Sequence, residues 1–294
     1  MDSIRAREIA DSFKIRGSAT HEIVAGEIGL TDKQKETVAT YTQRLKDFKD
    51  GVAKVKDLTN KQKDELANLL FKRDNPELPE GAKTHCKKWL KHYRFGRWPE
   101  LKNKYVEKGN KQEEEGFTLM ALQLNLGMVY KNTKRLSNDY SIGECDLDHN
   151  KVGYDNKCSY DLSTFPMYEF EIPDPKYWWQ LQNYNINWPH WEKMCLCYTL
   201  VDSGETEVKR AIKWTEDHDE IYKIVERMIY TKSEFARLHS LYFPLSTLKS
   251  FKEIPEENRI KTFYFEPSQE AKNLIKDRAY MCKEYIYNLL IKSN

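Results

Sequence analysis

The sequence predicts an α/β protein, in which helices and β-strands share one core. Apolar residues recur every three or four positions in several long segments, which is typical of helices. Shorter runs rich in β-branched and aromatic residues lie between them, which is typical of strands. The predicted helical regions are 30–73, 109–126, 174–188 and 269–291, and the predicted strands are 140–147, 151–159, 193–201 and 259–266.

The N-terminal part of the chain is predicted to be a helical extension over residues 1–80. Thr31 and Thr59 stand where two helices would begin, and each can cap the first turn with its hydroxyl oxygen. A break rich in proline follows at residues 74–81, where a helix could not continue. We therefore expect residues 81–294 to form the main domain, with a C-terminal helix.

Signals for turns and helix ends punctuate the central elements. Gly127 ends the helix that begins near Gly109. Asp148, His149 and Asn150 form a predicted turn between the first two strands. The next helix is predicted to begin with Asp174 as N-cap and Pro175 in its first turn, and Pro189 stops it.

Composition limits the classes of protein that the chain can represent. It has 294 residues, of which 39% are hydrophobic and 32% charged, and this suits a globular protein with a sizeable core. No apolar run of about 18 residues and no secretory leader is visible, so we expect a cytoplasmic protein that does not enter a membrane. The six cysteines include no C-x-x-C pair, which argues against a zinc ribbon or an iron–sulfur cluster.

The net charge of +2 conceals a strongly basic stretch. Between residues 83 and 111, ten Lys and Arg stand against two Glu, so this stretch carries +8 and the rest of the chain −6. Interleaved aromatic residues would suit a surface that follows a phosphate backbone. A solvated helix face with its aromatic side chains in the core is the alternative, and composition leaves both open. The candidate DNA-contacting residues are Lys87, Lys88, Lys91, Arg94, Arg97 and Lys108, and, further on, Lys134 and Arg135.

Candidate catalytic residues gather between Asp146 and Lys157. Asp155 and Lys157 are two apart on a predicted strand, so they share one face while Asn156 points away and leaves its carbonyl free. If the two strands pair as a hairpin, Asp146 can lie close to Asp155. Carboxylates that hold a hydrated Mg²⁺ beside a lysine can catalyse phosphodiester cleavage. Three charged residues in a hairpin also suit a solvated turn.

A glutamate on the preceding helix would complete such a site. On the predicted helix, Glu113 shares a face with one row of apolar residues and Glu115 shares a face with another. Glu114 shares a face with more polar residues. Periodicity does not separate Glu113 from Glu115. Downstream, Gln180 and Tyr184 are one helical turn apart, and Tyr184 could equally belong to a buried aromatic stripe.

The order of these motifs is more selective than any one of them. It runs G-x-x-x-E, G-x-x-D, D-x-K and Q-x-x-x-Y, and it resembles the PD-(D/E)XK nuclease superfamily, in particular the lambda-type and YqaJ-type recombination exonucleases. The segments that carry the resemblance are KGNKQEEE (108–115), GECD (143–146), DNKCSYDLSTFP (155–166), YWWQLQNY (177–184) and CYTLVDSGE (197–205). The chain departs from the pattern at Cys145, where the family has proline, and at Asp155, where glutamate is usual.

The resemblance implies a restriction-endonuclease-like core, with a mixed central sheet flanked by helices. It also implies a Mg²⁺-dependent deoxyribonuclease that processes duplex ends for recombination or replication, with one or two ions and with Mn²⁺ as a substitute. Its ligands would be Glu113, chosen by the family's spacing from Gly109, with Asp146, Asp155 and the carbonyl of Asn156. Lys157 would assist the nucleophile, and Gln180 and Tyr184 would support the site.

Several questions stay open at this stage. A structure-selective endonuclease of the same fold, or a DNA-binding or assembly protein on a degenerate nuclease core, would share these motifs. Residues 1–80 could clamp DNA, form a homo-oligomer interface or bind a single-strand annealing or binding protein. If a phage encodes the chain, the compartment is the host cytoplasm.

Overall fold

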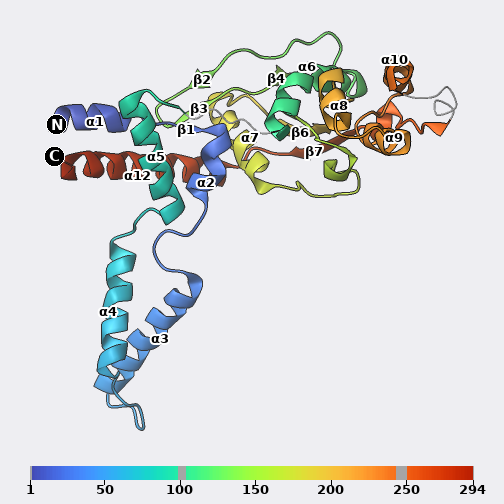
Figure 1. The fold of residues 1–294 in the computed structure, drawn as a ribbon. Helices are drawn as coiled ribbons and strands as arrows, with labels where there is room; N and C mark the ends of the chain where they lie inside the picture. Colours follow the sequence, from blue (N-terminus) through green and yellow to red (C-terminus); the bar gives the residue numbers. More distant parts are fainter. Residues whose placement is uncertain (1, 99–103, 243–249, 294) are drawn as a thin grey trace. The chain divides into compact units, whose positions relative to one another are not determined.

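The computed structural model describes residues 2–98, 104–242 and 250–293, and their side chains except those of 104–111 and 239–242. The chain forms two compact units (Figure 1). The sheet unit contains Arg16–Ser18 and Trp98–Lys272, and the helical unit contains Met1–Ile15, Ala19–Arg97 and Asn273–Asn294. The expected boundary near residue 80 stays a prediction.

A mixed four-stranded sheet forms the centre of the sheet unit. Its order is β4-β5-β6-β7, in which β5 and β6 are parallel and the two outer pairs are antiparallel. The strands are β4 (Leu147–His149), β5 (Val152–Cys158), β6 (Lys193–Thr199) and β7 (Ile260–Phe265). The predicted mixed sheet flanked by helices is therefore confirmed.

Side-chain alternation along β6 gives the sheet two apolar faces. Leu196 packs with Leu181 of α7 (Pro175–Asn187) on one face. Cys197 packs with Phe117 of α6 (Lys104–Gln123) on the other face. A Cβ at Gly116 would stand 2.5 Å from the Sγ of Cys158, so α6 comes this close to β5 only because residue 116 is glycine. Period-two alternation thus places a different helix on each face.

Further elements complete the sheet unit. A small sheet has the order β1-β3-β2, in which β2 and β3 are antiparallel. The helices that follow β6 pack around an apolar cluster of their own, which includes Val208, Val225 and Phe235. These elements are β2 (Leu136–Ser137), β3 (Ser141–Gly143), η2 (Leu162–Thr164), α8 (Glu205–Ile212), α9 (His218–Glu226), α10 (Lys232–Tyr242) and η3 (Glu256–Asn258), and also β1 (Ile15–Arg16) and η1 (Gly17–Ala19), of which residues 16–18 belong to this unit.

The predicted strand at 140–147 is in fact two strands in different sheets. β3 and β4 are separated by residues 144–146, whose backbone is held by Asn132: its N–H donates to the carbonyl of Asp146 and its side-chain amide to that of Cys145. The turn predicted at Asp148, His149 and Asn150 lies further along the chain: Asp148 and His149 belong to β4, and the turn consists of Asn150 and Lys151, both with positive φ, which suits a tight hairpin. The helix predicted to begin near Gly109 begins earlier, at Lys104.

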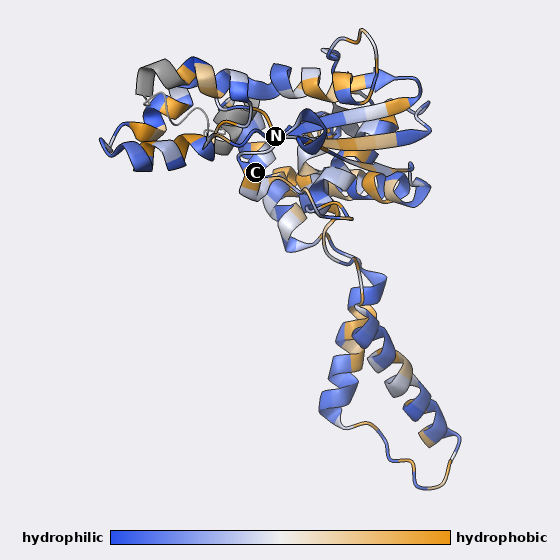
Figure 2. Ribbon diagram, turned by 90° about the vertical axis from the view of Figure 1, so that its right-hand side faces the viewer, coloured by the Kyte–Doolittle hydropathy of each residue, from blue (hydrophilic) through white to orange (hydrophobic). Residues whose placement is uncertain are grey.

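The helical unit contains the two predicted N-terminal helices. Thr31 and Thr59 each form a capping box with the glutamine three residues later. α3 (Asp32–Lys49) and α4 (Asn60–Asp74) pack side by side, and both are largely hydrophilic (Figure 2). The other helices of this unit are α1 (Ser3–Asp11), α2 (Thr20–Val24), α5 (Glu80–Phe95) and most of α12 (Gln269–Lys292). Within the described residues, no helix combines the length and the apolar character needed to span a bilayer.

Candidate active site

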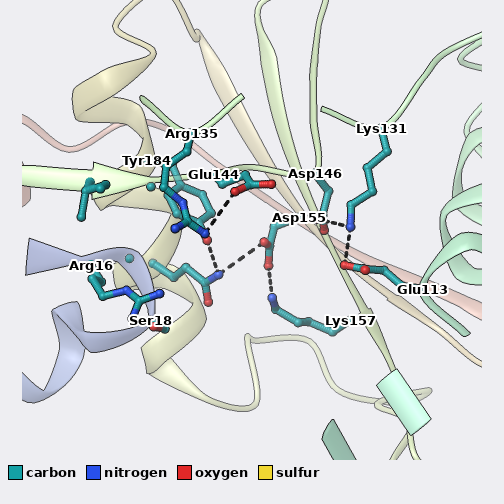
Figure 3. A pocket seen from close by; sticks show the side chains of 14 residues that line it. Arg16, Ser18, Glu113, Lys131, Arg135, Glu144, Asp146, Asp155, Lys157 and Tyr184 are labelled. Carbon is teal, nitrogen blue, oxygen red and sulfur yellow. Dashed lines mark hydrogen bonds and ion pairs between the residues drawn. The ribbon is translucent and has the colours of Figure 1, made fainter. Parts of the chain in front are cut away.

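One cavity of the sheet unit collects all the side chains that the sequence singled out as catalytic. Its volume is about 400 Å³, and it lies beside Asp155 and Lys157 of β5 (Figure 3). The predicted residues that line it are Glu113, Asp146, Asp155, Lys157, Gln180 and Tyr184. The other lining residues are Arg16, Gly17, Ser18, Lys131, Arg135, Ile142, Gly143 and Glu144.

The hairpin of β4 and β5 brings the two aspartates together. Leu147 pairs with Tyr154, so Asp146 stands opposite Asp155 one position further along. Asp146 Oδ2 also accepts a hydrogen bond of 2.6 Å from the backbone N–H of Asn156. Both carboxylates are largely buried, with 14% and 3% of their side-chain surface exposed.

Lys157 follows Asp155 on the same face of β5. Its Nζ lies 2.6 Å from Asp155 Oδ2, and it lies 5.1 Å from the ring centre of Tyr177. Burial disfavours the ammonium, but the charges of Asp155 and Asp146 outweigh it and raise the pKa of Lys157 above its usual range. Lys157 is therefore protonated at any physiological pH.

Two side chains of α7, Gln180 and Tyr184, support Asp155 through hydrogen bonds. The Gln180 amide donates to Asp155 Oδ1 at 3.4 Å and to the Tyr184 hydroxyl at 2.6 Å. Burial and the charge of Asp155 raise the pKa of Tyr184, so its hydroxyl stays neutral. The Tyr184 ring fits between two glycines: a Cβ at Gly17 or at Gly143 would stand 2.4 Å from a ring carbon.

Glu113 enters the cavity from α6 and meets a residue that the sequence had not indicated. Its Oε1 forms an ion pair with Lys131, whose Nζ also lies 3.7 Å from Asp146 Oδ1 (Figure 3). Burial opposes the charge of Lys131, but its hydrogen bond to Glu113 and the nearby carboxylates raise its pKa. Glu115 instead lines a separate cavity with Asp202. Of the two glutamates left open by periodicity, only Glu113 reaches the aspartates.

Two buried aspartates at one point repel each other. Burial, and then the charge of Asp155, raise the pKa of Asp146 from an ordinary value near 3.8 to about 6, against the attraction of Lys157. A carboxylate with a raised pKa gains from any additional cation that binds beside it. Holding both carboxylates charged and buried therefore costs free energy, and a cation bound beside them would remove this cost.

The oxygen donors fit Mg²⁺, although the predicted ligand set is only partly assembled. No group of three acidic, cysteine or histidine side chains in the described part of the chain converges closely enough to hold a metal alone. Asp146 and Asp155 face each other, whereas Glu113 reaches them through Lys131. Mg²⁺ commonly binds one or two carboxylates and takes its other ligands from water and substrate phosphate, so the two aspartates satisfy this need. The role of Asn156 stays a prediction.

The predicted DNA contacts divide into three groups. Arg135 lines the cavity, where it pairs with Glu144 at 3.3 Å, and Lys134 is exposed in the same segment. The side chains of Lys87, Lys88, Lys91, Arg94 and Arg97 are exposed on α5 or just beyond it, in the helical unit. The side chain of Lys108 lies outside the described side chains. Arg16 and Ser18 line the cavity but carried no sequence signal, because they lie in two very short elements.

Comparison with solved structures identifies the fold. A phage-related exonuclease from Haemophilus somnus 129PT superposes with a TM-score of 0.62 at 21% identity, over 96% of this chain and 97% of that one. The chain has the fold of phage-type exonucleases. An alkaline exonuclease, LHK-Exo, from Laribacter hongkongensis superposes with a TM-score of 0.50 at 8% identity, over 98% and 97% of the two chains. No protein-family profile and no curated protein sequence matches the chain.

Proposed function

We propose that the protein is a Mg²⁺-dependent deoxyribonuclease that acts as an exonuclease on the ends of duplex DNA. The observation that carries this proposal is the cavity itself. Asp146, Asp155 and Lys157 lie together at the hairpin, with Gln180 and Tyr184 behind them. Convergent buried charges are costly to desolvate unless a ligand uses them, which favours an active site over a solvated turn.

The residues of the cavity divide the work of phosphodiester hydrolysis. A bound Mg²⁺ would polarise the phosphate, acidify a water and stabilise the leaving oxygen. Asp146 and Asp155 would hold it. Lys157 would orient the attacking water and donate hydrogen bonds to the phosphate as negative charge develops there. Gln180 holds Asp155 in place, and Arg16 and Arg135 would attract the phosphate into the cavity.

The exonuclease proposal is supported by the fold, which the chain shares with a phage-related exonuclease and an alkaline exonuclease. Duplex DNA would be held through its phosphates by exposed basic side chains on or just after α5, namely Lys87, Lys88, Lys91, Arg94 and Arg97. A role in preparing ends for recombination or replication, with an annealing or binding protein as partner, follows from the same proposal.

Digestion of end-labelled linear duplex and of covalently closed circular DNA tests the proposal. We expect the linear duplex to be degraded with Mg²⁺, the circle to persist, and EDTA to stop the reaction. Asp155→Ala and Lys157→Ala should abolish degradation, whereas Lys151→Ala, which removes only a surface ion pair with Glu192, should not. Cleavage of the circle would favour a structure-selective endonuclease, and DNA binding without turnover would favour an assembly protein. Activity that survives chelation would overturn the mechanism.

A further inference from the structure

Lys131 places a positive charge between two of the proposed metal-binding side chains. Its ammonium forms an ion pair with Glu113 and lies 3.7 Å from the carboxylate of Asp146 (Figure 3). These two acids come from α6 and from the residue before β4, so Lys131 joins elements that otherwise carry like charges toward each other. A cation that bridges two such acids occupies the electrostatic position that a metal ion would take.

We propose that Lys131 is a built-in cation that neutralises Glu113 and Asp146 in the metal-free protein and is displaced when a divalent ion binds. The proposal rests on the metal-dependent function proposed above and adds a competitor for the metal within the chain. Metal affinity is then set partly by Lys131, because the ion has to replace its ammonium at both carboxylates. The ion also draws Glu113 toward the aspartates once Lys131 has left.

The balance of charge favours displacement over joint occupancy. Glu113, Asp146 and Asp155 carry three negative charges, and Lys131 and Lys157 carry two positive ones. A divalent ion added to all five would leave one excess positive charge beside the largely buried carboxylates of Asp146 and Asp155. If the Lys131 ammonium withdraws, the remaining four groups and the ion are neutral together, which lowers the cost of desolvation.

Lys131 is better suited to leave than Lys157. It belongs to the segment between α6 and β2, which forms neither helix nor strand, and its side chain is 33% exposed. Lys157 is fixed on β5, an interior strand of the sheet, and its ammonium lies over the ring of Tyr177. The flexible four-carbon stem of Lys131 can therefore carry its ammonium toward solvent without any change in the sheet.

Titration of the whole chain with Mn²⁺, without DNA, tests the proposal. Calorimetry, or electron paramagnetic resonance of the free ion, gives the dissociation constant directly. Lys131→Met should bind Mn²⁺ about tenfold more tightly than the wild type, because the competing charge at about 4 Å is gone. Lys134→Met, three residues away on the same segment and outside the cavity, should bind with wild-type affinity.

Thermal unfolding supplies a second readout. In EDTA, Lys131→Met should melt below the wild type, because Glu113 and Asp146 repel without their shared partner. Addition of Mn²⁺ should therefore raise its melting temperature by more than it raises that of the wild type. If Lys131→Met does not fold in EDTA, Lys131→Gln replaces it, since the amide can still donate to a carboxylate without competing as a charge.

The outcomes separate this inference from the proposed function. Asp155→Asn should weaken Mn²⁺ binding strongly. If the wild type does not bind Mn²⁺, or if Asp155→Asn binds it as tightly as the wild type does, the proposed metal site itself is wrong. If Asp155→Asn weakens binding but Lys131→Met leaves the affinity unchanged or lower, the metal site stands and the displacement of Lys131 is overturned.

Discussion

The carboxylate of Asp146 accepts a hydrogen bond of 2.6 Å from the backbone N–H of Asn156. This contact ties Asp146 to the strand that carries Asp155 and Lys157. The distance between the two acids is therefore set by β-sheet geometry and does not depend on long flexible side chains. Each acid also has a donor beside it, the N–H of Asn156 for Asp146 and the ammonium of Lys157 for Asp155, which offsets part of the cost of its burial.

Asp146→Asn should stabilise the metal-free protein more at about pH 8 than at about pH 5. The folded-state pKa of Asp146 is about 6, above the ordinary value near 3.8, so its contribution to stability is full below about 4 and is lost as the pH rises through 6. By about pH 8 the penalty approaches 3 kcal/mol, and about half of it is already present at about pH 5. The difference in free energy of unfolding between variant and wild type should thus widen by about 1 kcal/mol.

Urea unfolding in EDTA at the two pH values measures that difference. The comparison of variant with wild type at each pH removes the contribution of the other titrating groups. A gap that stays constant with pH, or that narrows as the pH rises, contradicts the prediction. Mn²⁺ should reverse the ranking, because a bound cation stabilises the wild-type carboxylate and not the amide.

Lys157→Met should abolish cleavage and leave DNA binding largely intact. The ammonium is the donor nearest to Asp155, and loss of one donor to a developing charge commonly costs about 100-fold or more in rate. The variant should also unfold more easily, since Asp155 then keeps the Gln180 amide as its one side-chain partner among the described residues. Single-turnover cleavage of a labelled duplex and a binding titration in Ca²⁺ separate the two effects.

Lys151→Met is the matched control for this experiment. Lys151 lies in the turn of the same hairpin, and its Nζ pairs with Glu192 at the surface. Exposed pairs of this kind contribute little, so rate and stability should both remain close to wild type. A cleavage rate in Lys157→Met that equals that of Lys151→Met would remove Lys157 from the mechanism.

Local spacing was sufficient to predict the residues that share one element. Asp155 and Lys157 share a face because strands alternate with a period of two, and Gln180 and Tyr184 share a face because four residues make about one helical turn. A hairpin was expected here, but the register that brings Asp146 opposite Asp155 depends on a two-residue turn at Asn150 and Lys151, whereas the sequence indicated a turn at residues 148–150. The α/β class followed from the patterns along the chain, and the mixed sheet with its flanking helices followed from the resemblance.

Contacts between distant segments could not be predicted in this way. Glu113 and Glu115 each share a helix face with comparable rows of apolar residues, and only the way α6 packs in the fold places Glu113 in this cavity and Glu115 in a separate one. Lys131 lies in a segment without periodicity, so no pattern indicated its position between two acids. The break between β3 and β4 was missed because its stabilising contacts come from Asn132, whose side chain carries no strand signal.

Gly143→Ala should destabilise the protein and impair cleavage together. The new Cβ would stand 2.4 Å from a ring carbon of Tyr184, so the ring has to move away from Gln180. Overpacking of a well-filled core typically costs about 1–3 kcal/mol. Thermal unfolding should show the loss, and the displaced Tyr184 should lower the cleavage rate at saturating DNA.

Gly81→Ala separates this steric effect from a general effect of replacing glycine. Gly81 lies in the first turn of α5, where a Cβ would meet only the backbone oxygen of Glu22 at an ordinary 3.6 Å. Alanine is the better helix former by about 1 kcal/mol, so this variant should be as stable as the wild type or more stable. If both variants are equally stable, the glycine at 143 is not needed to seat Tyr184.

Glu113→Gln should impair metal binding and cleavage, whereas Glu115→Gln should change only stability, although the two residues are close together on one helix. Glu113 faces Asp146 through Lys131, so its amide variant should weaken Mn²⁺ binding and slow cleavage by about tenfold or more. Burial, and the charges of Asp202 and Glu234, raise the pKa of Glu115, so its charged form is unfavourable in the folded state. The protonated Glu115 side chain therefore contributes to stability at low pH, and this contribution is lost as the pH rises. Glu115→Gln should raise the melting temperature at about pH 8. Its cleavage rate should stay at the wild-type level. Parallel melting and cleavage assays on the two variants measure both effects, and a loss of activity in Glu115→Gln with none in Glu113→Gln would assign the acid of α6 to the wrong residue.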